Sequence, residues 1–108
     1  MVQKDSNRIA HILEAAKNIH IFVEGVNKER FLENQMLISA VVRELSIIGE
    51  AAAALSVEFK ESMPDLPWRE IIGMRNHLVH AYFDTDEELI WETIQKDLPL
   101  LLDRINGC

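Results

Sequence analysis

The stretch LISAVVRELSIIGEAAAALSVEF, residues 37–59, decides the fold class of this chain. Its apolar side chains recur at steps of three or four residues, and the strip that they form is Leu37, Val41, Leu45, Ile48, Ala52, Leu55 and Phe59. That spacing follows the 3.6-residue period of an amphipathic α-helix and departs from the alternation of a β-strand. The stretch therefore predicts a long helix with one apolar face.

Traced back to Lys28, this helix would have 32 residues and a length of about 48 Å. A compact domain of this size has a radius of gyration of about 13 Å, so the helix would extend beyond its own domain. We expect it to bend around Gly49, to pack its protruding part on a second copy of the chain, or both. Gly49 and the run Ala51–Ala54 leave little side-chain bulk, so another helix can approach closely there.

A helix is also predicted before this stretch. Its apolar side chains again fall at steps of three and four, at Ile9, Ile12, Ala16, Ile19 and Val23. Asp5 or Ser6 can cap its start, and Gly25 is suited to end it. Asn27 then offers the N-cap of the next helix.

Two more helices are predicted in the second half of the chain. Pro67 suits the first turn of a helix whose apolar contacts would be Trp68, Ile71, Ile72, Leu78 and Val79. Residues 85–88, Thr-Asp-Glu-Glu, form a capping box that opens a last helix. Its apolar side is Leu89, Ile90, Ile94, Leu98, Leu101 and Ile105. Pro99 should kink this helix, because it cannot donate a backbone hydrogen bond.

The composition agrees with a single helical domain. The chain has 108 residues, of which 48% are hydrophobic and 27% charged, as in a globular protein. Four Gly and three Pro leave little room for the many turns of a β-sandwich, and no β pattern of convincing length is present. We therefore expect one all-α domain over residues 1–108, an up-and-down bundle of four to five helices that includes the long second helix.

Cysteine usage and hydropathy exclude several protein classes. The single Cys is the last residue, which excludes a disulfide framework and a zinc knuckle within one chain. The first ten residues lack the apolar segment of a signal peptide, and no apolar run approaches the roughly 20 residues that span a bilayer. We expect a soluble, cytoplasmic protein that does not associate with membranes.

The charge balance limits how the chain could bind nucleic acid. Eleven Lys and Arg against eighteen Asp and Glu give a formal net charge of −7. A broad electrostatic grip on phosphates needs clustered positive charge, which this balance disfavours. Any nucleic-acid chemistry must therefore be concentrated in a few residues.

Residues 73–84, GMRNHLVHAYFD, are the segment where chemistry concentrates. Arg75 offers a planar fork of donors that suits a phosphate or a pentavalent phosphorus. His80 can take and give a proton near neutral pH. An acid, a base and a cation are the minimum set for cleaving RNA without a metal. Asn76 and Tyr82 add polar groups beside this pair.

The spacing of Arg75 and His80 carries a constraint. The two residues are five positions apart, so an ideal helix would point them about 140° away from each other. They can meet on one phosphate if the helix ends near His80, or if two copies of the segment face each other. A symmetric dimer would also supply two His80 side chains, so that one could act as acid and the other as base.

Simpler readings of the same residues remain open. An Arg and a His near a helix end are often a cap and a packing contact. His77 and His80 could share a metal, although the chain has no His-Glu-x-x-His pair. Glu50 is interpreted as a partly buried acid, for which a salt bridge is a simpler role than catalysis. His11 and His20 on the first predicted helix are interpreted as surface or packing residues.

Arg75-x4-His80-x-Tyr82 resembles the Arg-x4-His-x-Tyr signature of the HepT-like branch of the HEPN superfamily, and Asn76 matches that superfamily's preference for a polar residue after the Arg. Similarity extends to residues 47–51, 67–76 and 91–99, so it covers roughly the whole chain. The resemblance implies a HEPN-like helical, dimeric or higher oligomeric ribonuclease that needs no metal or other cofactor. It also implies that the protein is the toxin of a type II toxin–antitoxin pair.

The resemblance further implies a partner and a mode of control. Members of the family are usually encoded beside a small MntA-like nucleotidyltransferase, the antitoxin, which transfers AMP to the motif Tyr, here Tyr82. Such an adduct would add negative charge and bulk close to His80, where an RNA phosphate must enter.

Two hypotheses of different classes follow. In the first, the chain is a ribonuclease toxin in which Arg75 holds the scissile phosphate, His80 acts as acid or base, and Asn76 supports them. In the second, it is a HEPN-type helical dimer that binds a nucleotide or a partner protein without cutting anything. A ribonuclease requires the Arg75 and His80 side chains to reach one accessible cleft, whereas a scaffold does not.

Overall fold

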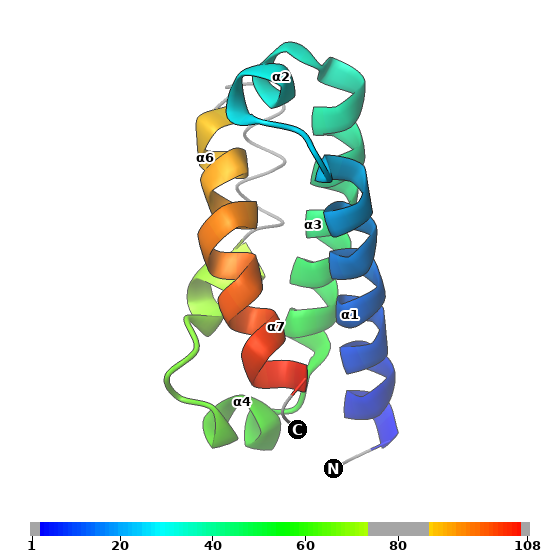
Figure 1. Ribbon diagram of the computed structural model, residues 1–108. Helices are drawn as coiled ribbons and strands as arrows, with labels where there is room; N and C mark the ends of the chain where they lie inside the picture. Colours follow the sequence, from blue (N-terminus) through cyan, green and yellow to red (C-terminus); the bar gives the residue numbers. More distant parts are fainter. Residues whose placement is uncertain (1–2, 74–86, 107–108) are drawn as a thin grey trace.

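Two long helices, α1 (Gln3–Val23) and α3 (Gln35–Ala54), pack side by side and form the frame of the fold (Figure 1). The computed structural model describes residues 3–73 and 87–106 of the chain. The other elements are α2 (Lys28–Glu33), α4 (Val57–Ser62), α6 (Glu87–Glu92), η1 (Thr93–Asp97) and α7 (Leu98–Asn106), and residues 68–73 are also helical. Within these ranges there is no strand, so the predicted all-α bundle is confirmed.

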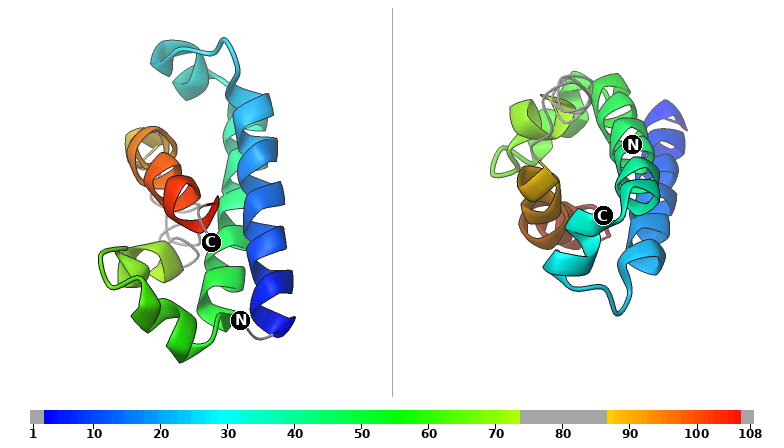
Figure 2. Two further views of the ribbon diagram at one scale, coloured as in Figure 1. Left: turned by 60° about the horizontal axis from the view of Figure 1, so that its bottom comes forward. Right: turned by 90° about the horizontal axis from the view of Figure 1, so that it is seen from above.

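The elements surround one apolar core. α6, η1 and α7 form one continuous helical run that packs on the α1–α3 pair, and α2 crosses one end of the bundle (Figure 2). Each long helix turns its predicted apolar strip inward. The most deeply buried large side chains are Ile12, Ile19, Phe31, Val41, Leu45, Ile48, Ile71, Leu101 and Ile105. Leu89 departs from the prediction, because its side chain is 41% exposed on α6.

The single helix predicted over residues 28–59 is wrong in its boundaries. Asn34 ends α2 and caps α3, where its Oδ1 accepts a hydrogen bond from the Leu37 amide at 3.0 Å. Ser56 separates α3 from α4 in the same way, because its hydroxyl accepts a hydrogen bond from the Phe59 amide at 3.1 Å. The side chains of Asn and Ser satisfy the free amides of a first helical turn, so both residues favour a new start.

The corrected boundaries remove one argument for a dimer. α3 has 20 residues and a length of about 30 Å, which fits within the 41 Å long axis of the molecule. Gly49, where a bend was expected, is buried within α3, which continues through it to Ala54. The helix therefore does not extend beyond the domain, and its length gives no reason to expect a second copy of the chain.

The start of α1 also differs from the prediction. The helix begins at Gln3, and Asp5 lies in its first turn with a side chain that is buried. The Asp5 carboxylate accepts hydrogen bonds from the Ser56 amide at 2.8 Å and from the Ser56 hydroxyl at 2.6 Å. Asp5 therefore joins the start of α1 to the start of α4. The predicted roles of Gly25 and Asn27 are confirmed: Gly25 follows α1 with φ +72°, and Asn27 caps α2.

This link makes the ionised form of Asp5 part of the fold. Hydrogen bonds from the Ser56 hydroxyl and then from the Ser56 amide lower the pKa of Asp5 below its usual value. Because the pKa is lower in the folded chain than in the unfolded one, the carboxylate stabilises the fold above its unfolded pKa. That contribution is lost as the pH falls through the folded pKa.

Pro99 shapes the C-terminal run through a π-helical turn. Over residues Thr93–Asp97 the backbone widens, and the Leu98 amide donates to the Thr93 carbonyl five residues earlier. In a regular helix the proline ring would clash with the carbonyl four residues before it, and a hydrogen bond would be lost. Where a kink was predicted at Pro99, the structure has a widened turn over Thr93–Asp97, and Pro99 is the second residue of the helix α7 that follows it.

Candidate functional site

The motif residues lie outside the part of the chain that the structure describes. This holds for Arg75, Asn76, His77, His80 and Tyr82, and also for Leu78, Val79 and the first two residues of the predicted capping box, Thr85 and Asp86. The predicted meeting of Arg75 and His80 on one phosphate accordingly stays a prediction. What the structure gives is the anchoring of the segments on either side.

The segment that leads into the motif is firmly attached to the bundle. Ile71 is 1% exposed and belongs to the core. The Trp68 indole Nε1 donates a hydrogen bond to the Met63 carbonyl at 3.0 Å, and its ring meets Phe59 edge-on with centroids 6.2 Å apart. The residues just before the motif are therefore fixed to α4 and to the loop that follows it.

The segment that leaves the motif is attached at another place. Gln35 Nε2 at the start of α3 donates to Glu87 Oε1 at the start of α6, at 3.0 Å. One helical turn later, the Trp91 ring packs on Phe31 of α2 with centroids 5.1 Å apart, and Ile90 is buried. Residues 74–86 thus join two anchored points, one beside α4 and one beside α2 and α3.

The acid that sequence reasoning singled out is not the buried one. Glu50 is exposed on α3, so its predicted partial burial is wrong. On α3 the buried acid is Glu44, which is 5% exposed and lies between α3 and α1. Its Oε1 accepts a hydrogen bond from Asn18 Nδ2 at 3.5 Å and lies 3.8 Å from Arg43 Nη1. The apolar strip of residues 37–59 gave no sign of it, because Glu44 lies one position before Leu45 at the border of that strip.

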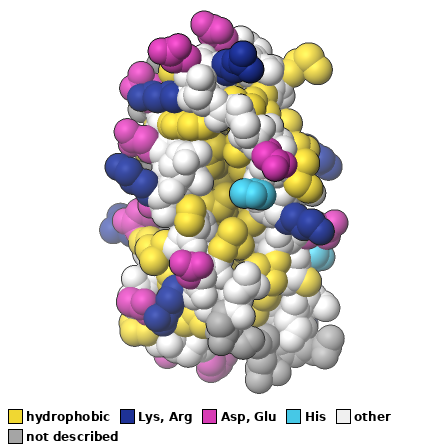
Figure 3. Space-filling model, in the orientation of Figure 1, with side chains coloured by type: hydrophobic (Ala, Val, Ile, Leu, Met, Phe, Trp, Pro, Cys, Tyr) yellow, Lys and Arg dark blue, Asp and Glu magenta, His cyan; other side chains and the backbone are white. Residues whose placement is uncertain are grey.

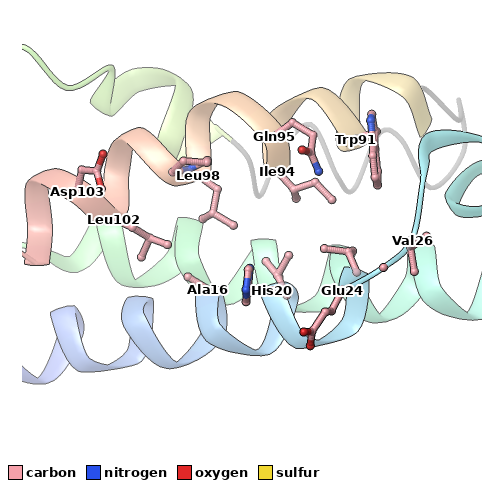
Figure 4. Close-up of a pocket in the computed structure, with 14 residues that line it drawn as sticks. Ala16, His20, Glu24, Val26, Trp91, Ile94, Gln95, Leu98, Leu102 and Asp103 are labelled. Atoms are coloured by element: carbon pink, nitrogen blue, oxygen red, sulfur yellow. The ribbon is translucent and has the colours of Figure 1, made fainter.

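Two hollows are built from the described helices. The smaller, of about 370 Å³, lies between α1 and α3 beside Glu44 and is lined by His11, Asn18 and Arg43. The larger, of about 670 Å³, lies between α1 and the α6–η1–α7 run (Figure 4). His20 lines this second hollow, and both His11 and His20 are exposed, as predicted for surface residues.

No candidate metal site appears in the ranges 3–73 and 87–106, where no three His, Cys, Asp or Glu side chains are grouped to hold an ion. The pair His77 and His80 is outside those ranges. None of the helices described is long and apolar enough to cross a membrane. On the face shown in Figure 3, acidic and basic side chains are interspersed around apolar surface, with no continuous basic area.

The comparisons with known proteins cover almost the whole chain. The family model described as "Ribonuclease HepT-like" matches residues 12–106. A relative named "Putative RNase" from Methanocaldococcus jannaschii is 40% identical over 88 residues, 82% of this chain and 81% of the relative. Another "Putative RNase", from Caldanaerobacter subterraneus subsp. tengcongensis, is 43% identical over 86% of this chain and 83% of its own. A "Probable ribonuclease HepT" from Thermococcus cleftensis is 38% identical over 94% of this chain and 92% of its own. No solved structure gives a significant match.

Proposed function

Because the chain belongs to the ribonuclease HepT-like family, as its motif predicted, we propose that it is a metal-independent endoribonuclease. The observation that carries this proposal is the position of Arg75-x4-His80-x-Tyr82 inside residues 12–106, the range that the family match covers. The names of three relatives, each similar along at least four fifths of this chain, support the same activity.

The chemistry proposed needs three groups and no metal. A base takes the proton of the ribose 2′-hydroxyl, whose oxygen attacks the adjacent phosphorus. An acid gives a proton to the departing 5′-oxygen, and the Arg75 guanidinium holds the extra negative charge of the pentavalent intermediate. His80 serves as acid or base, and Asn76 orients the phosphate through its amide. The products are a 2′,3′-cyclic phosphate and a 5′-hydroxyl.

The activity defines the first test. Purified protein incubated with single-stranded RNA should cleave it equally well with and without excess EDTA, and the fragments should end in 2′,3′-cyclic phosphate. Gel electrophoresis with end-group analysis measures both properties. Loss of cleavage in EDTA would contradict the metal-independent chemistry. Binding of RNA or nucleotide without any cleavage would favour the non-catalytic HEPN-type dimer.

We also propose that the active form is a homodimer, with the motif segments of both chains at its interface. The support is chemical: a dimer brings two His80 and two Arg75 side chains together, so that acid and base need not be the same residue. Analytical ultracentrifugation at micromolar protein should show a dimer or a larger assembly of dimers. A monomer that retains full activity would contradict this assembly.

The biological role proposed is that of a toxin. In this model the cleaved RNA is cellular, and an MntA-like nucleotidyltransferase neutralises the enzyme by modifying Tyr82. The support is the presence of the family's motif Tyr at position 82, which is the single Tyr of the chain.

A further inference from the structure

The larger hollow is a groove between two helical walls. One wall is the C-terminal half of α1, and the other is the α6–η1–α7 run (Figure 4). Lining residues recur at helical spacing on both walls, over positions 16–23 of α1 and positions 91–103 of the second wall, and residues 24–26 continue the first wall beyond the end of α1. At 1.5 Å per residue the second wall, which is helical throughout, gives a groove about 18 Å long, or about three helical turns.

The inner surface of the groove is mostly apolar, with polar side chains from His20 and Gln95, and it is incompletely covered. Ala16 and Leu98 belong to the core, whereas Val23, Val26, Trp91 and Leu102 are only half-buried although they pack against it. Figure 3 shows apolar surface running down the middle of this face. Several neighbouring apolar side chains are half-exposed here. Covering them with a further apolar surface removes apolar area from water and is favourable in free energy.

The borders of the groove are acidic. Glu24 lies directly after α1 on the first wall and Asp103 lies on α7, toward opposite ends of the groove, and both side chains are exposed (Figure 4). Among the residues that the structure describes, none of those lining the groove is Lys or Arg. A partner that carries negative charge, such as RNA, is therefore disfavoured here.

We propose that this groove is the docking site of a basic amphipathic helix from a partner protein. Two walls with helical spacing accept the apolar face of a third helix, whose residues at i, i+3, i+4 and i+7 enter between them. Lys or Arg on both sides of that face would then meet Glu24 and Asp103. The inference goes beyond the proposed ribonuclease activity, because it is argued from residues 16–26 and 91–103, which lie outside the motif.

A second copy of this chain is a poorer occupant. A two-fold contact through the groove would bring Glu24 and Asp103 of one copy toward the same acids of the other. Like charges that face each other across an interface weaken it, and each chain already carries a net charge of −7. A basic helix offers charge that is complementary to Glu24 and Asp103, whereas a second copy of the chain does not.

The test uses two synthetic peptides and the full-length protein. The basic peptide is a fluorescein-labelled 16-mer with Leu on one helical face, Lys on both sides of that face and Ala elsewhere; the acidic peptide has Glu in place of every Lys. Fluorescence anisotropy measures binding of both. In addition, Trp68→Phe leaves Trp91 as the single tryptophan, so its emission reports whether the groove itself is occupied.

We expect the protein to bind the basic peptide at least tenfold more tightly than the acidic one, with a change in Trp91 emission. The double variant Glu24→Lys, Asp103→Lys should reverse this preference, with a loss of about tenfold for the basic peptide. Glu58→Lys and Glu33→Lys together make the same charge change at exposed positions outside the groove and should keep the preference. If the charge-reversed variant does not fold, Glu24→Gln with Asp103→Asn should remove the preference without reversing it.

Three outcomes would overturn the proposal. The first is an equal loss of binding in the control variant, which would mean that net charge alone attracts the peptide. The second is binding without any change in Trp91 emission. The third is a smaller oligomer for the charge-reversed variant than for the wild type, which would make a second copy the occupant.

Discussion

His80→Ala is expected to lower the rate of RNA cleavage by about 10²–10⁴-fold, because a positioned acid or base typically contributes that much. Toxicity in cells should disappear with it. The loss should not come from unfolding, because His80 is predicted to lie near a helix end, where truncation of a side chain costs little packing energy. Circular dichroism melting should therefore leave the midpoint close to that of the wild type, while gel assays show the loss of cleavage.

The chain offers a matched control for this experiment. His11 is an exposed His on α1, and His11→Ala should cleave RNA like the wild type. A folded His80→Ala protein with undiminished cleavage would remove His80 from the mechanism. Loss of activity together with unfolding would indicate a structural role. Arg75→Lys should also impair cleavage, because an ammonium cannot reproduce the paired donors of a guanidinium.

The fold was predictable to the extent that apolar periodicity determines it. The strips on α1, α3 and the C-terminal run point inward almost as predicted, because a side chain that repeats every 3.6 residues has one face on which to be buried. Periodicity does not show where a helix is interrupted. At Asn34 and Ser56 the helix is interrupted, but the spacing of apolar side chains continues across each interruption. One helix was therefore predicted where three are found.

Contacts between distant residues were not predictable from local pattern. Asp5 reads as a cap for its own helix, yet its carboxylate binds Ser56, 51 positions away. The groove is equally hidden, because Val23 and Trp91 come close only after the C-terminal run folds back on α1. The motif differs in that its residue types, over positions 75–82, indicate the chemistry directly. Whether their side chains meet depends on tertiary structure, which the local sequence does not give.

Tyr82→Phe is expected to separate catalysis from its control. In the proposed modification the Tyr82 hydroxyl oxygen attacks the α-phosphorus of ATP, a phosphodiester forms, pyrophosphate leaves and the hydroxyl proton passes to a base. The adduct adds a negative charge two residues from His80, repels substrate phosphate and can pair with Arg75. Tyr82→Phe keeps the ring and removes the attacking oxygen. The variant should therefore cleave RNA like the wild type and stay active after incubation with nucleotidyltransferase and ATP, whereas the wild type should lose nearly all cleavage.

Intact-protein mass spectrometry decides between the possible roles of this hydroxyl. The wild type should gain one or more adenylate masses, and Tyr82→Phe should gain none. An undiminished gain in the variant would place the adenylate on another residue and contradict this model of control. Reduced cleavage by the variant before any nucleotidyltransferase is added would mean that the hydroxyl also takes part in catalysis. Because an adenylate paired with Arg75 occupies the place of the substrate phosphate, excess RNA present during the reaction should slow the modification. Once the covalent adduct has formed, the remaining activity should come from unmodified enzyme, so kcat per total protein should fall while KM stays close to that of the unmodified protein.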